Sequence, residues 1–217
     1  LIYSTDKNYS KLINSYKKNI FERYKILKDY SYDLEWIEAL ERKIADLGIK
    51  IYKKRYEHIL VLNENLKKLD FYKKNYYKIS INIYDEFINN KKNDLLKLLE
   101  QYLENLKKNR KFDALVGGCM IGPHKSDIVG HNIDTNTNIN QFSTGQQKTV
   151  ILLIILAHCN FLIKELKKNP VILFDEICSH LDLENRELLL DLIEILNVQT
   201  FITGNEKNFF SFLSTKA

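Results

Sequence analysis

The sequence has few of the residues that interrupt helices or cross-link chains. Its 217 residues include 2 prolines and 7 glycines, and residues 1–112 contain no proline and a single glycine, Gly48. A stretch with so few turn residues favours long helices. The three cysteines, Cys119, Cys159 and Cys178, are scattered and odd in number, so they form neither a disulfide framework nor a zinc-binding spacing. We expect each to be a buried apolar side chain in a reducing compartment.

Methionine is also scarce. The chain begins at Leu1 and its single methionine is Met120. Because a translated protein normally begins with Met, we expect this chain to be a fragment without its N-terminal part. No signal peptide is visible, and the longest apolar run, residues 150–157, is far shorter than the ~18 residues that span a bilayer. The sequence therefore predicts a protein with no membrane partner.

Charge is unevenly divided along the chain. Residues 1–112 hold 25 Lys and Arg against 16 Asp and Glu, a balance of +9, whereas residues 113–217 hold 8 against 12, a balance of −4. A basic half favours a polyanionic partner. The alternative is a biased genomic base composition, since Lys, Asn, Ile and Tyr are abundant throughout the chain.

The first 112 residues predict a mainly helical arm. Apolar residues at helical spacing form one stripe along this region. The stripe first runs through Ile37, Leu40, Ile44, Leu47 and Ile51, and it then shifts to Tyr52, Tyr56, Ile59, Leu62, Leu66 and Leu69. A second helical stretch covers about residues 91–108. Between them, residues 78–84 alternate in polarity and predict a short strand. We therefore expect an arm domain over residues 1–112 and a second domain over residues 113–217.

A short polar stretch opens a long apolar helix in the second domain. It reads Ser143-Thr144-Gly145-Gln146-Gln147-Lys148. Ser143 and Gln146 have the spacing of a capping box, and residues 150–157 are apolar on every face, which predicts a buried helix. The N–H groups of a helix N-terminus can bind phosphate, and Gly145 would let such a ligand approach the backbone. The alternative is a well-capped core helix without a ligand.

A second stretch combines an apolar strand with two carboxylates. Residues 171–174 form a continuous apolar run, as in a parallel strand covered on both faces. Asp175 and Glu176 follow at its carboxyl end, where open α/β sheets bind ligands. Asp175 would hold Mg²⁺, mainly through water, and Glu176 would orient or deprotonate an attacking water. The alternative is an acidic turn after a core strand.

The remaining C-terminal residues predict a βαβ unit. Asp182 can cap a helix that carries Leu188, Leu192 and Leu196, and residues 198–203 form the next strand. Two strands that flank a helix imply a right-handed crossover in a parallel sheet. Residues 113–142, which hold four of the glycines, predict loops, with a hairpin or turn over residues 134–140.

Three elements together resemble the RecF family, the recombination and gap-repair ATPases related to the SMC and Rad50 proteins. They are the motif Gly122-Pro123-His124-Lys125-Ser126-Asp127, the stretch from Ser143, and residues 170–182. The resemblance covers the whole chain and corresponds to RecF without its N-terminal lobe. It implies an α/β fold: a partial P-loop NTPase, namely the C-terminal portion of an ABC-type head with parallel strands, plus the mainly helical arm. The family often has Arg and Asp where this chain has Lys125 and Ser126, so the role of that loop stays open between structural and interfacial.

The resemblance also implies a mechanism that uses ATP and Mg²⁺ in a head-to-tail homodimer. The residues of the signature, Ser143, Thr144, Gly145, Gln146, Gln147 and Lys148, would face the γ-phosphate held by the other protomer. Asp175 and Glu176 would act on Mg²⁺ and water within their own protomer. The D-loop would run from Ser179 to Asp182 across the dimer interface, and Thr203 would lie near the switch position.

The partners implied by the resemblance are nucleic acid and recombination proteins. They are single-stranded or gapped duplex DNA, which would contact the basic arm, together with RecR/RecO-type mediators and a recombinase. The implied setting is recombinational repair, replication-gap maintenance and the SOS response, in a bacterial cytoplasm and near the nucleoid.

The sequence contains no G-x-x-x-x-G-K-[ST] phosphate loop. We therefore expect the chain not to hydrolyse ATP unless another lobe completes it. Three alternatives remain open: an ABC transporter ATPase subunit, an SMC-like structural chromosome protein, and an inactive truncated remnant. The helical arm and the signature with Gln147 argue against the transporter, and an SMC-like coiled coil would need far longer heptad repeats.

Overall fold

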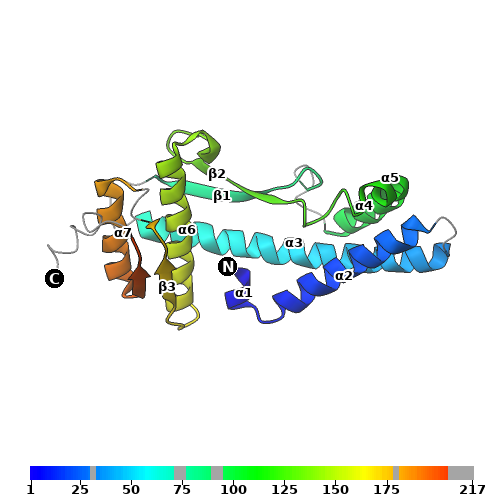
Figure 1. Ribbon diagram of the computed structural model, residues 1–217, viewed down its shortest axis with the longest axis horizontal. Coiled ribbons are helices and arrows are strands. Elements are labelled where there is room, and N and C mark those ends of the chain that lie inside the picture. Colours follow the sequence, from blue (N-terminus) through cyan, green and yellow to red (C-terminus); the bar gives the residue numbers. More distant parts are fainter. Residues whose placement is uncertain (30–32, 71–76, 89–94, 178–180, 205–217) are drawn as a thin grey trace. The chain divides into compact units, whose positions relative to one another are not determined.

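The computed structural model describes residues 1–29, 33–70, 77–88, 95–177 and 181–204. These residues form seven α-helices, one 3-10 helix and four β-strands (Figure 1). In chain order the elements are α1 (Ile2–Thr5), α2 (Tyr9–Lys28), α3 (Leu34–Asp70), β1 (Ile79–Tyr84), α4 (Leu95–Lys108), α5 (Arg110–Val116), β2 (Asp127–Asn132), η1 (Ile139–Gln141), α6 (Thr144–Lys164), β3 (Val171–Phe174), α7 (Leu183–Leu196) and β4 (Gln199–Ile202).

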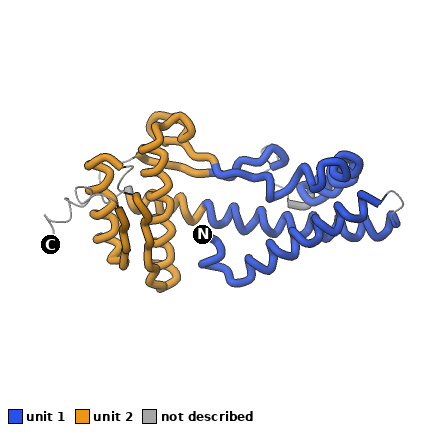
Figure 2. Tube along the Cα trace, in the orientation of Figure 1, with its two compact units in different colours: residues 1–59, 82–128 blue, residues 60–81, 129–217 orange. Residues whose placement is uncertain are grey.

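The chain forms two compact units, coloured blue and orange in Figure 2. The first unit comprises residues 1–59 and 82–128, and the second comprises residues 60–81 and 129–217. This division differs from the boundary at residue 112 that composition suggested, because β1 pairs with β2 across that boundary. The assignment of an arm domain and a head domain on either side of residue 112 stays a prediction.

The first unit has a core made mainly of helical side chains. The apolar stripe predicted on α3 is confirmed at Ile37, Ile44 and Ile51, which are fully buried. Tyr56 is an exception, because its side chain is 51% exposed. Arg55 also fits spacings of three and four along the helix, and it is half-buried and donates to the hydroxyl of Tyr9 on α2 over 3.1 Å.

Gly48, the single glycine of residues 1–112, lets α4 approach α3 closely. A Cβ at this position would lie 2.5 Å from Cε1 of Tyr102, a side chain on α4 that is completely buried. Real side chains essentially never approach so closely, so any larger residue at position 48 would force the two helices apart. A glycine within a helix costs roughly 1 kcal/mol relative to alanine, and the packing of Tyr102 offsets that cost.

The second unit is built around one parallel strand pair. Val171 of β3 lies opposite Gln199 of β4, and Phe174 lies opposite Ile202. The helix α7 connects the two strands, and the Asp182 carboxylate caps it by accepting the backbone N–H of Asn185 over 2.8 Å. The strand, the cap, the helix and the second strand therefore follow one another as the sequence predicted.

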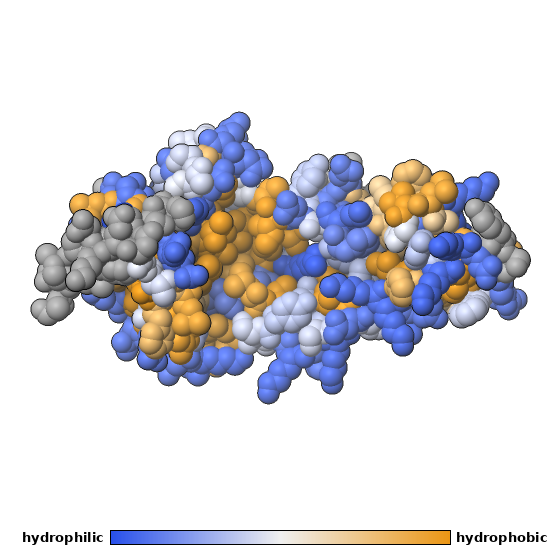
Figure 3. Space-filling model, viewed as in Figure 1, coloured by the Kyte–Doolittle hydropathy of each residue, from blue (hydrophilic) through white to orange (hydrophobic). Residues whose placement is uncertain are grey.

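The helix α6 is more apolar than α7, the other described α-helix that lies wholly within the second unit. By length and composition it could cross a membrane, which counting the run at residues 150–157 alone did not reveal. However, 56% of its most apolar window is buried within the protein, as in the core helix of a soluble protein. Asn160 of α6 donates to Asn65 of α3 over 2.8 Å inside this core. Burial is incomplete, because Ile151 is exposed, and Figure 3 shows apolar side chains reaching the surface over α6.

One face of the β3–β4 pair is bare. Val171, Leu173 and Phe201 are 55%, 74% and 54% exposed, whereas Ile172 and Phe174 on the opposite face are buried. The expectation of a strand covered on both faces is therefore wrong for the part of the chain that the structure describes. Successive side chains of a strand point to opposite faces, and the described elements cover only one of them.

Candidate functional site

Two acidic residues that follow β3 are hydrogen-bonded to Thr203, which follows β4. The Thr203 Oγ1 lies 2.5 Å from the Asp175 Oδ1, and the backbone N–H of Glu176 donates to the same Oγ1 over 3.1 Å. The Thr203 N–H donates to the carbonyl of Phe174 over 2.9 Å, which extends the strand pairing by one step. The structure thus brings together three residues that the sequence analysis singled out.

The backbone of Glu176 is in an uncommon conformation. Its φ is +49°, in the left-handed region that residues other than glycine seldom adopt. Both Asp175 and Glu176 are exposed. Strained residues of this kind concentrate at functional sites, because the surrounding structure must hold them in place.

The Asp175 carboxylate fits a Mg²⁺ ion whose remaining ligands come from elsewhere. Among the described residues, no group of three or more His, Cys, Asp or Glu side chains could hold a metal ion alone. Mg²⁺ keeps several waters and typically binds one or two protein carboxylates together with substrate phosphates. Asp175, oriented by the Thr203 hydroxyl, is suited to be one such ligand.

The expected capping box at the start of α6 is confirmed. The Ser143 Oγ accepts the Gln146 N–H over 3.3 Å, and the Gln146 Oε1 accepts the Ser143 N–H over 3.0 Å. The Gln147 side chain donates to two carbonyls of the preceding turn. Thr144 and Gly145 begin the helix, where N–H groups have no intrahelical acceptor. A helix start of this kind can bind an anion, and an anion-binding role for these residues stays a prediction.

Three further residues, Lys148, Asp182 and Ser179, were predicted to belong to the site. Lys148 is half-buried near the start of α6. Asp182 uses its carboxylate as the N-cap of α7, and Ser179 lies outside the described residues. The signature and the carboxylate pair belong to different elements of the second unit, one at a helix start and the other at two strand ends.

The loop that begins at Gly122 is hydrogen-bonded into the first unit. Gly122 has a φ of +126°, and a Cβ there would collide with the hydroxyls of Tyr102 and Tyr16. The Tyr16 hydroxyl lies 2.8 Å from the Tyr102 hydroxyl and 3.0 Å from the His124 Nδ1. The His124 Nε2 lies 2.8 Å from the carbonyl of Cys119. Glycine at position 122 thus makes room for a polar network that anchors the loop.

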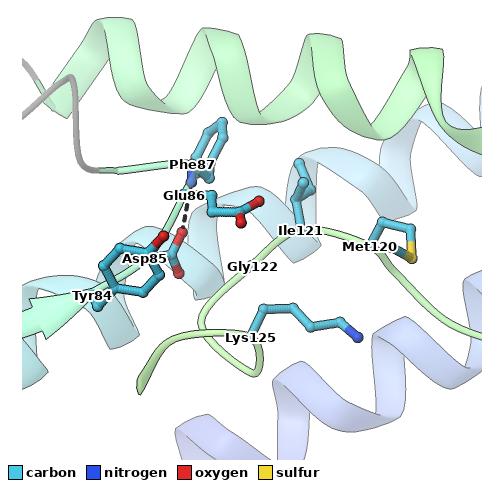
Figure 4. Close-up of a pocket in the computed structure, with 8 residues that line it drawn as sticks. All are labelled: Tyr84, Asp85, Glu86, Phe87, Met120, Ile121, Gly122 and Lys125. Atoms are coloured by element: carbon cyan, nitrogen blue, oxygen red, sulfur yellow. Dashed lines mark hydrogen bonds between the residues drawn. The ribbon is translucent and has the colours of Figure 1, made fainter. Parts of the chain in front are cut away.

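A pocket of about 300 Å³ opens beside this loop within the first unit (Figure 4). It is lined by Tyr84, Asp85, Glu86, Phe87, Met120, Ile121, Gly122 and Lys125. The buried Asp85 accepts hydrogen bonds from the Tyr52 hydroxyl over 2.8 Å and from the Ser126 hydroxyl over 2.7 Å. Burial raises the pKa of the Tyr52 phenol, which therefore remains a donor. These contacts favour a structural role for the loop. Of the loop residues that line the pocket, the exposed Lys125 is the charged one.

The fold and the site define a class of protein. A capped apolar helix, a parallel βαβ unit with carboxylates at its carboxyl end and a long helical region are consistent with part of a P-loop NTPase fold.

Comparison with known proteins identifies the family. No protein-family model matches the chain. The DNA replication and repair protein RecF of Rickettsia prowazekii (strain Madrid E) is 31% identical over 220 residues, which cover all of this chain and 59% of that relative. RecF of Rhizobium meliloti (strain 1021) is 28% identical over 217 residues, covering 58% of its length. The chain belongs to the RecF family, and it corresponds to the C-terminal part of these relatives.

Solved structures show the same fold. A structure of the recombination mediator protein RecF-ATP in the RecFOR pathway matches 94% of this chain and 54% of its own, with a TM-score of 0.74 and 23% identity. A second structure, RecF-ATPrS, gives the same TM-score at 26% identity and is covered over 55% of its chain. The chain thus spans little more than half the length of the proteins it matches.

Proposed function

We propose that this chain is the C-terminal part of an ATP-dependent DNA-binding protein of RecF type, which acts in recombinational repair and in the maintenance of replication gaps and forks. The observation that carries the proposal is the pair Asp175 and Glu176, tied by Thr203 at the carboxyl end of a parallel strand pair. The names of the curated relatives, DNA replication and repair protein RecF, support the same setting.

The carboxylate pair would act on ATP and water. A bound Mg²⁺ would neutralise charge on the β- and γ-phosphates. Asp175 would hold that ion through its water shell, and Glu176 would orient the attacking water or accept its proton. Both carboxylates are exposed, so they are accessible to a nucleotide that another part of the protein binds.

The signature would act across a homodimer in the ATP state. The N-terminal end of α6, with Ser143 and Gly145, would present N–H groups to the γ-phosphate held by the other protomer. The exposed Ser143 and Thr144 support such a role. The chain has no phosphate-loop motif of its own, so we propose that it does not hydrolyse ATP without a lobe that carries one.

The partners we propose are DNA, RecR/RecO-type mediators and a recombinase. The excess of basic residues over positions 1–112 supports contacts to DNA phosphates, with single-stranded or gapped duplex DNA as the substrate. Contacts of this type release counterions, so binding should weaken steeply as salt is raised. A role in the bacterial cytoplasm, near the nucleoid and within the SOS response, fits that substrate.

Two substitutions in the full-length natural protein test the proposal. Ser143→Arg should block ATP-driven dimerisation by crowding the phosphate contact, whereas Asn14→Arg, at an exposed position of α2, should not. Glu176→Gln should slow hydrolysis by at least about a hundredfold while ATP-bound dimers persist. Light scattering after size exclusion measures the dimers and phosphate release measures turnover. Normal dimers with Ser143→Arg, or unchanged turnover with Glu176→Gln, would contradict the assigned roles.

A further inference from the structure

We infer that Thr203 is a positioning residue that fixes the carboxylate of Asp175 and the backbone of Glu176 at once, rather than a contact to phosphate. The inference rests on the proposed function for its chemistry, and on three features of the structure. They are the short contact from Thr203 to Asp175, the hydrogen bond from the Glu176 N–H to the same hydroxyl, and the left-handed backbone of Glu176.

The direction of the two hydrogen bonds follows from their partners. A backbone N–H can only donate, so the Thr203 Oγ1 accepts from Glu176 over 3.1 Å. An ionised carboxylate can only accept, so the hydroxyl proton of Thr203 is donated to the Asp175 Oδ1 over 2.5 Å. Bonds to an ionised group are shorter and stronger than those between neutral groups. One hydroxyl therefore uses its proton and a lone pair on the two residues that directly follow β3.

This arrangement orients each carboxylate in a different way. The bond to the Asp175 Oδ1 fixes the rotation of the carboxylate and directs the Oδ2 away from Thr203. The bond to the Glu176 N–H stabilises a backbone conformation with a φ of +49°, which determines where the Glu176 side chain leaves the chain. A change at Thr203 would therefore loosen the metal ligand and the water-orienting group together.

The hydroxyl is itself held by the sheet. Thr203 directly follows β4, and its N–H donates to the carbonyl of Phe174 over 2.9 Å. This bond continues the parallel register in which Phe174 lies opposite Ile202. Groups carried by regular strands are placed more exactly than groups on free loops, so the strand pairing defines the position of the Thr203 Oγ1.

The test compares three variants of the full-length natural protein. Thr203→Val removes the hydroxyl and keeps the shape, whereas Thr203→Ser keeps the hydroxyl. Thr200→Val is the matched control, because among the described residues the hydroxyl of Thr200, within β4, bonds the carbonyl of Val198 over 3.3 Å and neither carboxylate residue. The first readout is the Mg²⁺ concentration that gives half-maximal binding of a fluorescent ATP analogue. The second is the hydrogen-exchange rate of the Glu176 amide, measured without nucleotide.

The expected results separate a positioning role from a general loss of structure. Thr203→Val should raise the half-saturating Mg²⁺ concentration about tenfold, the size of effect typical when a group that orients a metal ligand is removed. It should also speed exchange of the Glu176 amide, while Thr203→Ser and Thr200→Val stay close to the unmodified protein. If Thr203→Val does not fold, Thr203→Cys, which keeps a side chain of similar size with a weak donor, should give the same two changes.

Two outcomes would overturn the inference. One is an unchanged Mg²⁺ requirement in Thr203→Val, and the other is a Glu176 amide that exchanges as slowly as in the unmodified protein. Failure of the proposed function would look different. The unmodified protein would then bind no nucleotide at any Mg²⁺ concentration, while the amide exchange of Glu176 would still report on the link to Thr203.

Discussion

The Arg23 Nη1 lies 2.7 Å from the Asp113 Oδ2 inside the first unit, although 90 positions separate the two residues in the chain. Arg23 is completely buried and also reaches the Glu41 carboxylate over 3.0 Å and the Leu106 carbonyl over 2.6 Å. Arg110 makes a second contact to Glu41 over 2.6 Å. Two guanidinium groups thus meet two carboxylates, and the cluster as a whole carries no net charge.

Arg23→Met should destabilise the protein by about 3–5 kcal/mol, because it leaves the buried Asp113 carboxylate without its guanidinium partner and removes one of the two guanidinium groups at Glu41. Urea unfolding followed by circular dichroism measures the loss. Lys18→Met is the control, since Lys18 lies on the exposed side of the same helix and its replacement should change the free energy of unfolding by at most about 0.5 kcal/mol. A loss below about 1 kcal/mol for Arg23→Met would show that this cluster contributes little.

Gly122→Ala should cost at least about 2 kcal/mol of stability, since overpacking adds to an unfavourable backbone angle. The added methyl group would displace the hydroxyls of Tyr16 and Tyr102. Gly118→Ala provides the comparison, because no atom lies within 4 Å of the position of its Cβ. Thermal unfolding of both variants gives the difference. Equal melting temperatures would mean that the loop shifts at no cost.

Stability should fall as the pH is lowered from about 6.5 to about 4. Burial lowers the pKa of His58 to about 4, whereas an unfolded histidine titrates near 6.5. Within that range the unfolded state binds more protons, so acid favours unfolding. Desolvation of the ring lowers the pKa of His124 in the same direction, although part of this residue is exposed.

Melting temperatures at about pH 7 and about pH 5 test this dependence. His58→Gln should reduce the decrease in melting temperature between the two conditions. His131→Gln, at a half-buried position of β2, controls for the loss of any histidine. If the unmodified protein and His58→Gln lose the same number of degrees, His58 does not contribute to the acid sensitivity.

Neighbouring residues of β3 should respond differently to a polar substitution. Ile172→Gln places an amide in the buried face and should cost about 2–4 kcal/mol. Leu173→Gln alters the bare face and should change the stability of this chain by at most about 0.5 kcal/mol. In the full-length natural protein, Leu173→Gln should become costly if a further segment covers that face. Thermal unfolding of this chain and of the full-length natural protein, each with and without Leu173→Gln, measures the two costs. If Leu173→Gln leaves the stability of the full-length protein unchanged, no segment covers that face.

Local patterns in the sequence were sufficient for much of the second unit. The apolar run of β3, the reciprocal cap of Ser143 and Gln146, and the cap at Asp182 each depend on residues close together in the chain, and all three are confirmed. The strand β2 was missed, because residues 127–132 contain Gly130 and lack the alternation that marks a strand.

Long-range contacts could not be predicted in the same way. The link between Asp175 and Thr203 depends on the register of β3 and β4, and a shift by one residue would turn the hydroxyl away. Arg23 has no local signal that distinguishes it from an exposed cation on a helix. Tyr56 fits the spacing of the apolar stripe on α3, yet its side chain is exposed, because spacing alone does not fix which of two adjacent positions faces the core.

The bare face of β3 and β4 also bears on how long the chain survives in a cell. Each strand has one neighbour among the described residues, so each keeps an edge of unpaired backbone groups beside an apolar surface. Chaperones and proteases act on such surfaces, and a loss of stability of about 1–2 kcal/mol can alter protein abundance several-fold. The lifetime of the polypeptide would then be set by how soon another segment covers Leu173 and its neighbours, which couples its abundance to its assembly.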